Sequence, residues 1–157
     1  MAKKGLCIIG GILMFFSVFL PVLFFTMSFE GYGFSASSSV YYWMWGYAYA
    51  VSTVSGGGMS SSAASGGSMG LDRIGVICMF IIILGAILAL ATSSGSSKGP
   101  LFGGILGMLG MIIYYVIILI GGFSLSPLGN FGATMIPFIG FYVCLIGGIL
   151  AIIGGSK

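Results

Sequence analysis

The sequence predicts an all-α membrane protein: a four-transmembrane-helix bundle with a small antiparallel β element in its first extracellular loop. Of its 157 residues, 59% are hydrophobic and only 4% are charged. An average soluble domain has roughly 25% charged residues, so this chain cannot cover a water-exposed surface in the usual way. Most of its surface is therefore expected to face lipid.

Four apolar stretches are long enough to cross a bilayer as helices. A hydrocarbon core about 30 Å thick needs about 20 apolar residues, because every backbone polar group must be satisfied within the segment. None of the four stretches contains a charged residue, which would be costly to bury in hydrocarbon. The predicted spans are residues 5–27, 74–92, 101–122 and 135–154.

The first span has an alternative interpretation as a cleaved signal peptide, because Lys3 and Lys4 precede an apolar run. The apolar core of such a peptide is usually about 7 to 15 residues long, and this run is longer. A membrane anchor is therefore the preferred interpretation.

The basic residues predict that both termini are cytoplasmic, because Lys and Arg in short loops and tails are retained on that side. Four of the five basic residues fall on one side of a four-span arrangement: Lys3, Lys4, Lys98 and Lys157. The connection 93–100 is then cytoplasmic. The outer side carries a long loop, residues 28–73, and a short loop, residues 123–134. The expected location is the cell membrane.

The long outer loop contains an aromatic segment at residues 40–54. Aromatic residues occupy every second position from 41 to 49: Tyr41, Trp43, Trp45, Tyr47 and Tyr49. This alternation predicts a strand. Its candidate partners are residues 29–34 before it and part of 60–69 after it. Residues 55–70 are rich in Gly and Ser, which indicates a flexible linker and a sheet with one poorly ordered edge.

The aromatic residues have three possible roles. Trp and Tyr favour the headgroup region of a membrane, so they could form an interfacial belt that anchors the loop. They also dominate the binding hot spots of protein interfaces, so they could form a contact surface for assembly. A site that stacks a carbohydrate or a quinone is the third possibility.

Glycines recur at helical spacing in the last two predicted spans. Gly103 and Gly107 form a GxxxG pair, and the last span repeats glycine every seven residues, at Gly140, Gly147 and Gly154. Small residues let two helix backbones approach closely, so these glycines predict helix packing. The contact could lie within one bundle, between copies of the chain, or along a pore.

A group of charged residues is expected at the start of the second span. Asp72 and Arg73 are adjacent there, and Glu30 could approach Arg73 from the beginning of the loop. We expect these three residues to form an ion pair that pins the outer loop to the helices. Proton transfer is disfavoured, because no acidic or histidine relay continues into the spans.

The composition argues against catalysis. The chain has no histidine and only two acidic residues, so it lacks the side chains for a catalytic triad, a carboxylate pair or a typical metal centre. No catalytic residue, metal site or cofactor is predicted, and the chain is not expected to be an enzyme.

The predicted topology resembles that of the claudin-like tetraspan membrane proteins. The shared features are four spans, cytoplasmic tails, a long first outer loop with strand character, a Trp-Met-Trp-Gly element at residues 43–46, and Arg73 at the entry of the second span. Claudins carry a Gly-Leu-Trp element followed by two cysteines in this loop. Here the loop has no cysteine, so the residue matches are Trp45 and Arg73. The resemblance implies an outer domain with a sheet and lateral self-assembly.

The expected function is non-enzymatic structural assembly in the membrane, as a self-associating scaffold or as a small accessory subunit of a membrane complex. The expected partners are the lipid bilayer and either a second copy or another membrane protein, contacted through helix faces and the aromatic loop. Nucleic acid is not expected as a partner. The alternative is an oligomeric channel or transporter, although the spans offer few polar residues to line a path. A third alternative is an enzyme that acts on lipid or quinone. It is disfavoured, because the chain offers no suitable acid, base or metal ligand.

Overall fold

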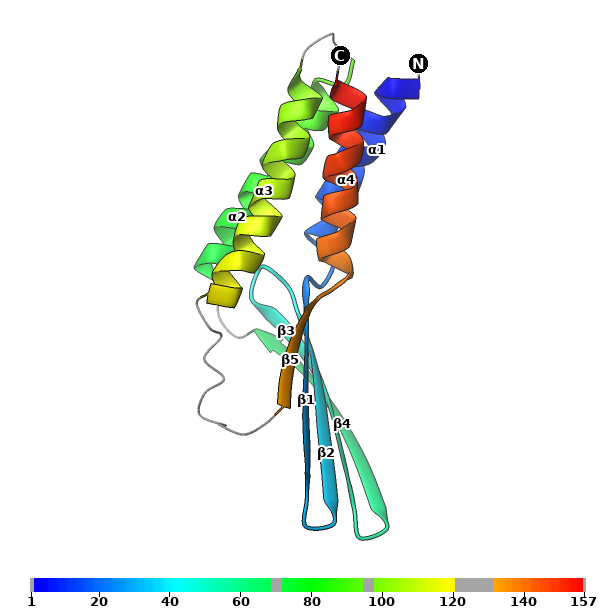
Figure 1. The fold of residues 1–157 in the computed structure, drawn as a ribbon, viewed down its shortest axis with the longest axis vertical. Helices are drawn as coiled ribbons and strands as arrows, with labels where there is room; N and C mark the ends of the chain where they lie inside the picture. The colour runs from blue at the N-terminus through cyan, green and yellow to red at the C-terminus, as the bar shows by residue number, and fades with distance from the viewer. Residues whose placement is uncertain (1, 69–71, 95–97, 121–131, 157) are drawn as a thin grey trace.

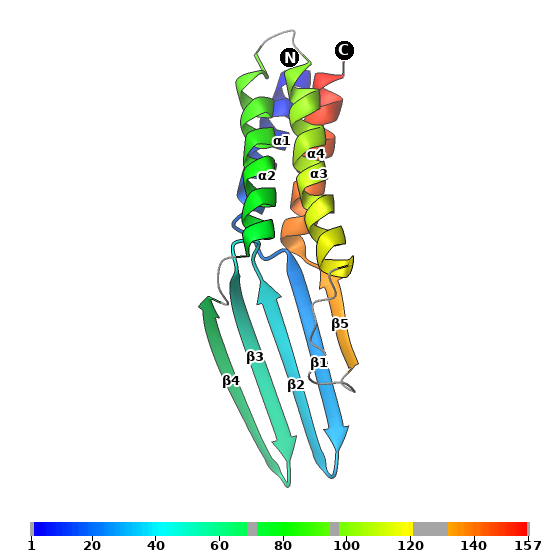
Figure 2. The same ribbon diagram turned by 90° about the vertical axis from the view of Figure 1, so that its left-hand side faces the viewer.

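The computed structural model describes residues 2–68, 72–94, 98–120 and 132–156. In these residues, four helices pack at one end of an elongated molecule and a five-stranded antiparallel sheet extends from the other end (Figure 1, Figure 2). The helices are α1 (Ala2–Ser17), α2 (Arg73–Ala91), α3 (Gly99–Ile120) and α4 (Ile139–Gly155). The strands are β1 (Leu23–Gly31), β2 (Phe34–Tyr42), β3 (Tyr47–Gly56), β4 (Met59–Ser68) and β5 (Gly132–Pro137).

The predicted all-α class is wrong, because the sheet is a major part of the fold. The strand order is β4-β3-β2-β1-β5, so both predicted outer loops contribute strands. β5 pairs with β1 from Leu23↔Pro137 to Ser28↔Gly132. The first and fourth predicted spans, 5–27 and 135–154, are each divided between a helix and a strand.

Proline and strand-forming residues explain this division. α1 ends at Ser17, and Pro21 then lacks the N–H that a continuing helix needs and biases the residue before it towards an extended conformation. β1 follows from Leu23 with aromatic and β-branched residues that favour strands. An apolar run alone does not distinguish a buried strand from a helix.

Two of the described helices, α2 and α3, are long and apolar enough to cross a membrane by length and composition. α1 and α4 are apolar but shorter. The predicted bundle of four transmembrane helices is therefore wrong.

Two tight turns set the register of the sheet. β1 and β2 are joined through Tyr32 and Gly33, with φ angles of 51° and 78°, and β3 and β4 through Gly57 and Gly58, with φ angles of 59° and 82°. Two-residue hairpin turns of this kind require positive φ at both positions, and their twist matches that of the strands. The second hairpin overturns the linker expectation for residues 55–70, because β4 pairs with β3 along its whole length. Backbone hydrogen bonds hold β4 against β3, and the composition of the side chains does not indicate whether such bonds form.

The helices contact one another through small residues. A Cβ atom added at Gly85 of α2 would lie 2.6 Å from the carbonyl oxygen of Gly103 and 2.7 Å from the nitrogen of Gly107 in α3. At such distances the two backbones touch, which glycine permits because it has no side chain. α1 packs against α4 in a similar way, near Gly10 and Gly147.

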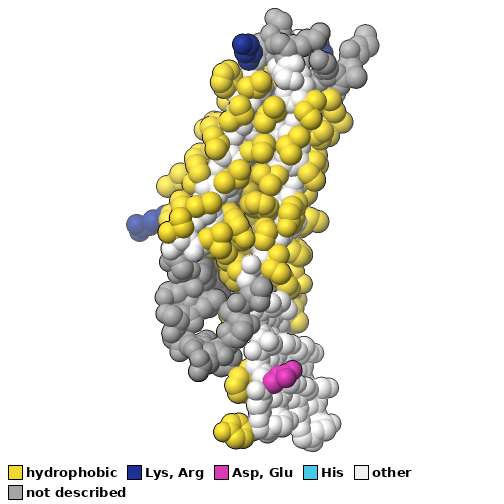
Figure 3. Space-filling model, viewed as in Figure 1, with side chains coloured by type: hydrophobic (Ala, Val, Ile, Leu, Met, Phe, Trp, Pro, Cys, Tyr) yellow, Lys and Arg dark blue, Asp and Glu magenta, His cyan; other side chains and the backbone are white. Residues whose placement is uncertain are grey.

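Large apolar side chains cover the outside of the helices. The buried residues of α2 are mostly small: Gly75, Cys78, Ile82, Gly85, Ala86 and Ala89. On its outer surface, Ile77 and Phe80 are 60% and 58% exposed. Hydrophobic side chains cover the helices on the face shown in Figure 3, whereas other side chains predominate on the sheet. A helix at the surface of a soluble protein has the opposite arrangement, with polar residues outside.

The α2–α3 contact predicts the effect of filling one glycine. In Gly103→Ala, the new Cβ would lie 2.5 Å from the Gly85 carbonyl oxygen and would force the helices apart. We expect a loss of about 1 to 3 kcal/mol in the free energy of unfolding, measured by denaturation in mixed micelles. Gly5→Ala is the matched control, because nothing lies within 4 Å of its Cβ position. Equal stability of the two variants would contradict the packing.

Candidate functional site at the junction of helices and sheet

The aromatic segment contains a turn at the point where the sheet meets the helices. β2 ends at Tyr42 and β3 begins at Tyr47, so residues 43–46 form a connection that we call the junction turn. The backbone N–H of Gly46 donates to the Trp43 carbonyl at 3.0 Å, and that of Trp43 donates to the Tyr47 carbonyl at 2.9 Å. The prediction of one strand over residues 40–54 is therefore wrong at its centre. The alternation of aromatic residues could not reveal this turn, because it continues unchanged from β2 through the turn into β3.

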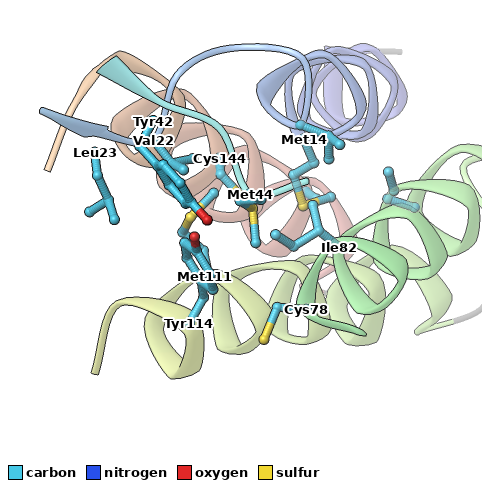
Figure 4. Close-up of a cluster of buried hydrophobic side chains, with 14 of the residues drawn as sticks. Met14, Val22, Leu23, Tyr42, Met44, Cys78, Ile82, Met111, Tyr114 and Cys144 are labelled. Carbon is cyan, nitrogen blue, oxygen red and sulfur yellow. The ribbon is translucent and has the colours of Figure 1, made fainter. Parts of the chain in front are cut away.

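Met44 fixes the junction turn in the core of the helices. Its side chain is fully buried and lies near Met14, Ile82 and Cys144 (Figure 4). The Met44 carbonyl is so close to Gly75 of α2 that no Cβ would fit there. On the other side of the turn, the Trp43 indole N–H donates to the Phe19 carbonyl just after α1, at 3.0 Å. The junction turn thus attaches the sheet to α2 and to the segment that follows α1.

The predicted aromatic residues gather at this junction in two clusters. On the sheet, the Tyr41 ring lies 6.4 Å from that of Tyr49 and 5.0 Å from that of Phe24. At the turn, the Tyr47 ring lies 5.2 Å from that of Trp43 and 5.3 Å from that of Trp45. Trp45 and Tyr49 are 41% and 38% exposed, so both clusters present aromatic surface outward.

Asp72 connects the beginning of α2 to α3. Its carboxylate accepts hydrogen bonds from the backbone N–H groups of Ile74 and Gly75 at 3.1 and 3.0 Å, which caps the N-terminus of α2. The hydroxyl of Tyr114 in α3, which is 1% exposed, donates to the same carboxylate at 3.2 Å. No local pattern in the sequence indicates that Asp72 pairs with Tyr114, because the two residues are 42 positions apart.

Tyr42 lies beside this pair at the end of β2. Its hydroxyl and that of Tyr114 point towards each other (Figure 4). Burial, together with the nearby negative charge of Asp72, raises the pKa of Tyr42 to about 12. The Tyr42 hydroxyl therefore stays protonated well above physiological pH.

The structure does not bring Glu30 to the other members of the expected ion pair. Asp72 and Arg73 lie at the start of α2, whereas Glu30 pairs with Ser35 near the far end of the β1–β2 hairpin. Glu30 is seven residues beyond Leu23, which corresponds to about 23 Å along a strand. The straight course of β1 carries Glu30 away from the helices.

The predicted packing glycines make contacts inside the chain. Gly103 faces α2, whereas a Cβ at Gly107 would meet the sulfur of Met14 in α1. A Cβ at Gly147 would lie 2.7 Å from the Gly10 carbonyl oxygen, and one at Gly140 would lie 2.9 Å from the Pro21 carbonyl oxygen. Gly154 is half-buried near the end of α4. At the four contacting positions, the helix face is already covered by a neighbouring helix or by the chain that follows α1.

The junction couples the helices to the sheet mechanically, through the cap at Asp72 and the hydrogen bond from Trp43 to the Phe19 carbonyl. Its polar groups are engaged in capping and in helix-to-sheet hydrogen bonds. Within the described part of the chain, no group of three His, Cys, Asp or Glu side chains could hold a metal ion.

No protein-family model matches this sequence, and no curated protein is significantly similar to it. The resemblance to claudin-like proteins stays a prediction. It is based on the topology predicted from the sequence and on the residue matches at Trp45 and Arg73.

The hydrogen bond between Tyr114 and Asp72 predicts coupling between two substitutions. Asp72→Ala removes the cap and leaves the buried Tyr114 hydroxyl without its acceptor, so we expect a loss of about 2 to 4 kcal/mol in unfolding free energy. Adding Tyr114→Phe removes the orphaned hydroxyl and should recover part of this loss. A double-mutant cycle measures the coupling, expected at about 0.5 to 3 kcal/mol. Strictly additive effects would rule out the interaction.

Proposed function

We propose that this chain is a non-enzymatic integral membrane protein that acts in structural assembly. The helices hold it in the bilayer, and the sheet stands outside the membrane as the surface for assembly. The observation that carries the proposal is the reversed distribution of side chains in the helices, with small residues inside and large apolar residues outside.

Lipid accounts for the outer surface of the helices. Only 33% and 39% of the most apolar stretches of α2 and α3 are buried within the protein. The remainder is largely Ile, Leu and Phe, which water would solvate poorly over such a continuous area. In a bilayer this surface costs nothing to expose, and helix association relies on close contact between small residues, as at Gly85 and Gly103. α2 and α3 are long enough to cross the membrane as helices alone. The chain also crosses beside them at α1 and α4, where the segments that lead to β1 and from β5 complete the crossing of these shorter helices.

Basic residues favour a cytoplasmic location for the end of the helices far from the sheet. Lys4 lies at this end, where its ammonium donates to the Ser94 carbonyl at 3.3 Å, and Lys98 immediately precedes α3. α1 begins and α4 ends at the same end (Figure 1). The positive-inside rule then gives cytoplasmic termini and an extracellular sheet. The aromatic clusters at the junction fall at the expected height of the headgroups, where Trp and Tyr are preferred.

The sheet is the favoured surface for assembly. β4 is exposed along its whole length, and so are Tyr32 and Phe34 at the far end of the β1–β2 hairpin. The proposed partner is a second copy or another membrane protein, reached through the sheet and the outward aromatic surface. A pore through one chain is not favoured, because Met14, Ile82 and Met111 fill the helix core without any exposure.

Two serine positions test the orientation in intact expressing cells. Ser35 lies near the far end of the sheet and Ser94 at the opposite end of the molecule, and both are exposed. A membrane-impermeant maleimide should label Ser35→Cys in intact cells but label Ser94→Cys only after permeabilisation. The natural cysteines are buried, so the unmodified chain is the background control. Equal labelling of both variants in intact cells would refute the orientation.

Assembly is tested by measuring the mass of the intact complex after gentle extraction from native membranes. We expect a mass greater than that of one chain, with a second copy or another membrane protein present. Chemical crosslinking before extraction controls for losses in detergent. A lone monomer in both measurements would contradict the proposed function.

A further inference from the structure

The outer edge of β4 is open and lacks the protection that sheet edges usually have. β4 is the end strand among those that the structure describes, and all ten of its residues are exposed. Natural edge strands are commonly protected by charged residues, by proline or by a bulge. β4 reads MSSSAASGGS, with no charge and no proline, and its pairing with β3 is continuous.

The register of the hairpin shows which backbone groups point outward. The two-residue turn makes Gly56 and Met59 a hydrogen-bonded pair, and hydrogen-bonded and non-hydrogen-bonded pairs then alternate along an antiparallel ladder. Residues 59, 61, 63 and 65 therefore direct their N–H and C=O groups to β3. The outward-directed groups belong to Ser60, Ser62, Ala64 and Gly66.

We propose that β4 pairs antiparallel with β4 of a second copy that lies in a facing membrane, so that two sheets become one. The pairing is centred on Ala64, which lies opposite Ala64 of the other copy. Ser62 then lies opposite Gly66. The outward-directed N–H and C=O groups of each copy therefore meet those of the other copy on both sides of Ala64. This inference rests on the proposed function, because it requires the sheet to be extracellular.

The side chains of β4 favour a second copy as the occupant. In strand addition, main-chain hydrogen bonds supply affinity and side-chain pockets supply specificity for a different partner. Apart from Met59, β4 carries only Ser, Ala and Gly, which form no such pockets. Opposed across the two-fold axis, these residues are small and uncharged, so self-pairing brings neither a clash nor a like-charge contact.

The direction of the strand favours a facing membrane. β4 runs along the long axis of the molecule, between the tip of the hairpin and the helices (Figure 2). An antiparallel partner is therefore inverted, and its helices lie at the opposite end of the joined sheet. Two copies in one membrane would present β4 in parallel, and parallel pairing is less stable per residue. In this register nine residues of each strand, 60–68, are paired, which corresponds to a membrane separation of about 31 Å.

Disulfide trapping between two vesicle populations tests the register. Ser61→Cys is reconstituted in one population of phosphatidylcholine and phosphatidylglycerol vesicles, and Gly67→Cys in another. In the proposed register these residues form a non-hydrogen-bonded pair with Cα atoms about 4.5 Å apart, within disulfide reach. Neither position crowds a neighbour, because Ser61 is exposed and nothing lies within 4 Å of a Cβ at Gly67. Impermeant maleimide, applied to a separate aliquot of each population that is not oxidised afterwards, measures the outward-facing share.

The expected result is a disulfide-linked dimer only when the two populations are mixed. Ser61→Cys alone should form none, because the two Ser61 positions would be about 20 Å apart. Ala64→Pro should lower the mixed yield at least about tenfold, because both copies lose a central hydrogen bond. Ala64→Ser is the control that keeps the N–H. Circular dichroism checks that the proline variant, whose change falls on the open side of an edge strand, retains its sheet.

The outcomes separate this inference from the proposed function. A Ser61→Cys dimer formed within one population would indicate parallel pairing in one membrane and would overturn the inference. The absence of any disulfide, with outward sheets present and a multi-chain mass after native extraction, would also overturn it and leave the proposed function standing. A lone monomer in native membranes would overturn both.

Discussion

The structure depends on the hydrogen bonds that join its two transitions between helix and strand. The chain leaves α1 for β1 beside the point where it leaves β5 for α4. The N–H of Phe138 donates to the Val22 carbonyl at 2.8 Å, and that of Gly140 donates to the Pro21 carbonyl at 3.0 Å. The N–H of Val22 in turn donates to the Tyr42 carbonyl at 2.9 Å. Backbone groups buried at this depth must be paired. The segment that follows α1 and the segment that begins α4 supply these partners to each other, so each transition depends on the other.

The same junction makes helices and sheet one mechanical unit. The buried core is continuous from Ile82 in α2 through Met44 in the junction turn to Leu23 and Phe25 in β1. A sheet attached by a flexible linker could tilt freely, whereas this sheet keeps the direction of the helices. For a protein that presents a surface away from a membrane, a fixed direction lowers the entropy lost when that surface is engaged. The aromatic clusters lie at this rigid point, which suits an anchor as well as a contact.

The sequence predicted what depends on local pattern. The stretches 74–92 and 101–122 correspond closely to α2 (Arg73–Ala91) and α3 (Gly99–Ile120), because long uncharged apolar runs have few other solutions. The prediction was wrong where one apolar run contains both a helix and a strand, as on either side of Pro21. Composition also misled at Met59–Ser68, because a strand can be held by its backbone while its side chains resemble a linker. The contact of Tyr114 with Asp72 and the insertion of Met44 depend on the tertiary fold, and no local signal reports them.

In the proposed function, the junction lies at the membrane surface, with the helices in lipid and the sheet in water. Both tryptophans of the chain, Trp43 and Trp45, belong to the junction turn, so its natural fluorescence reports on this turn alone. The most direct measurement is quenching of this fluorescence in vesicles by lipids brominated at different depths of the acyl chain. We predict the strongest quenching by bromines nearest the headgroup, and progressively weaker quenching by deeper ones. Quenching by aqueous iodide with none from any brominated lipid would contradict it.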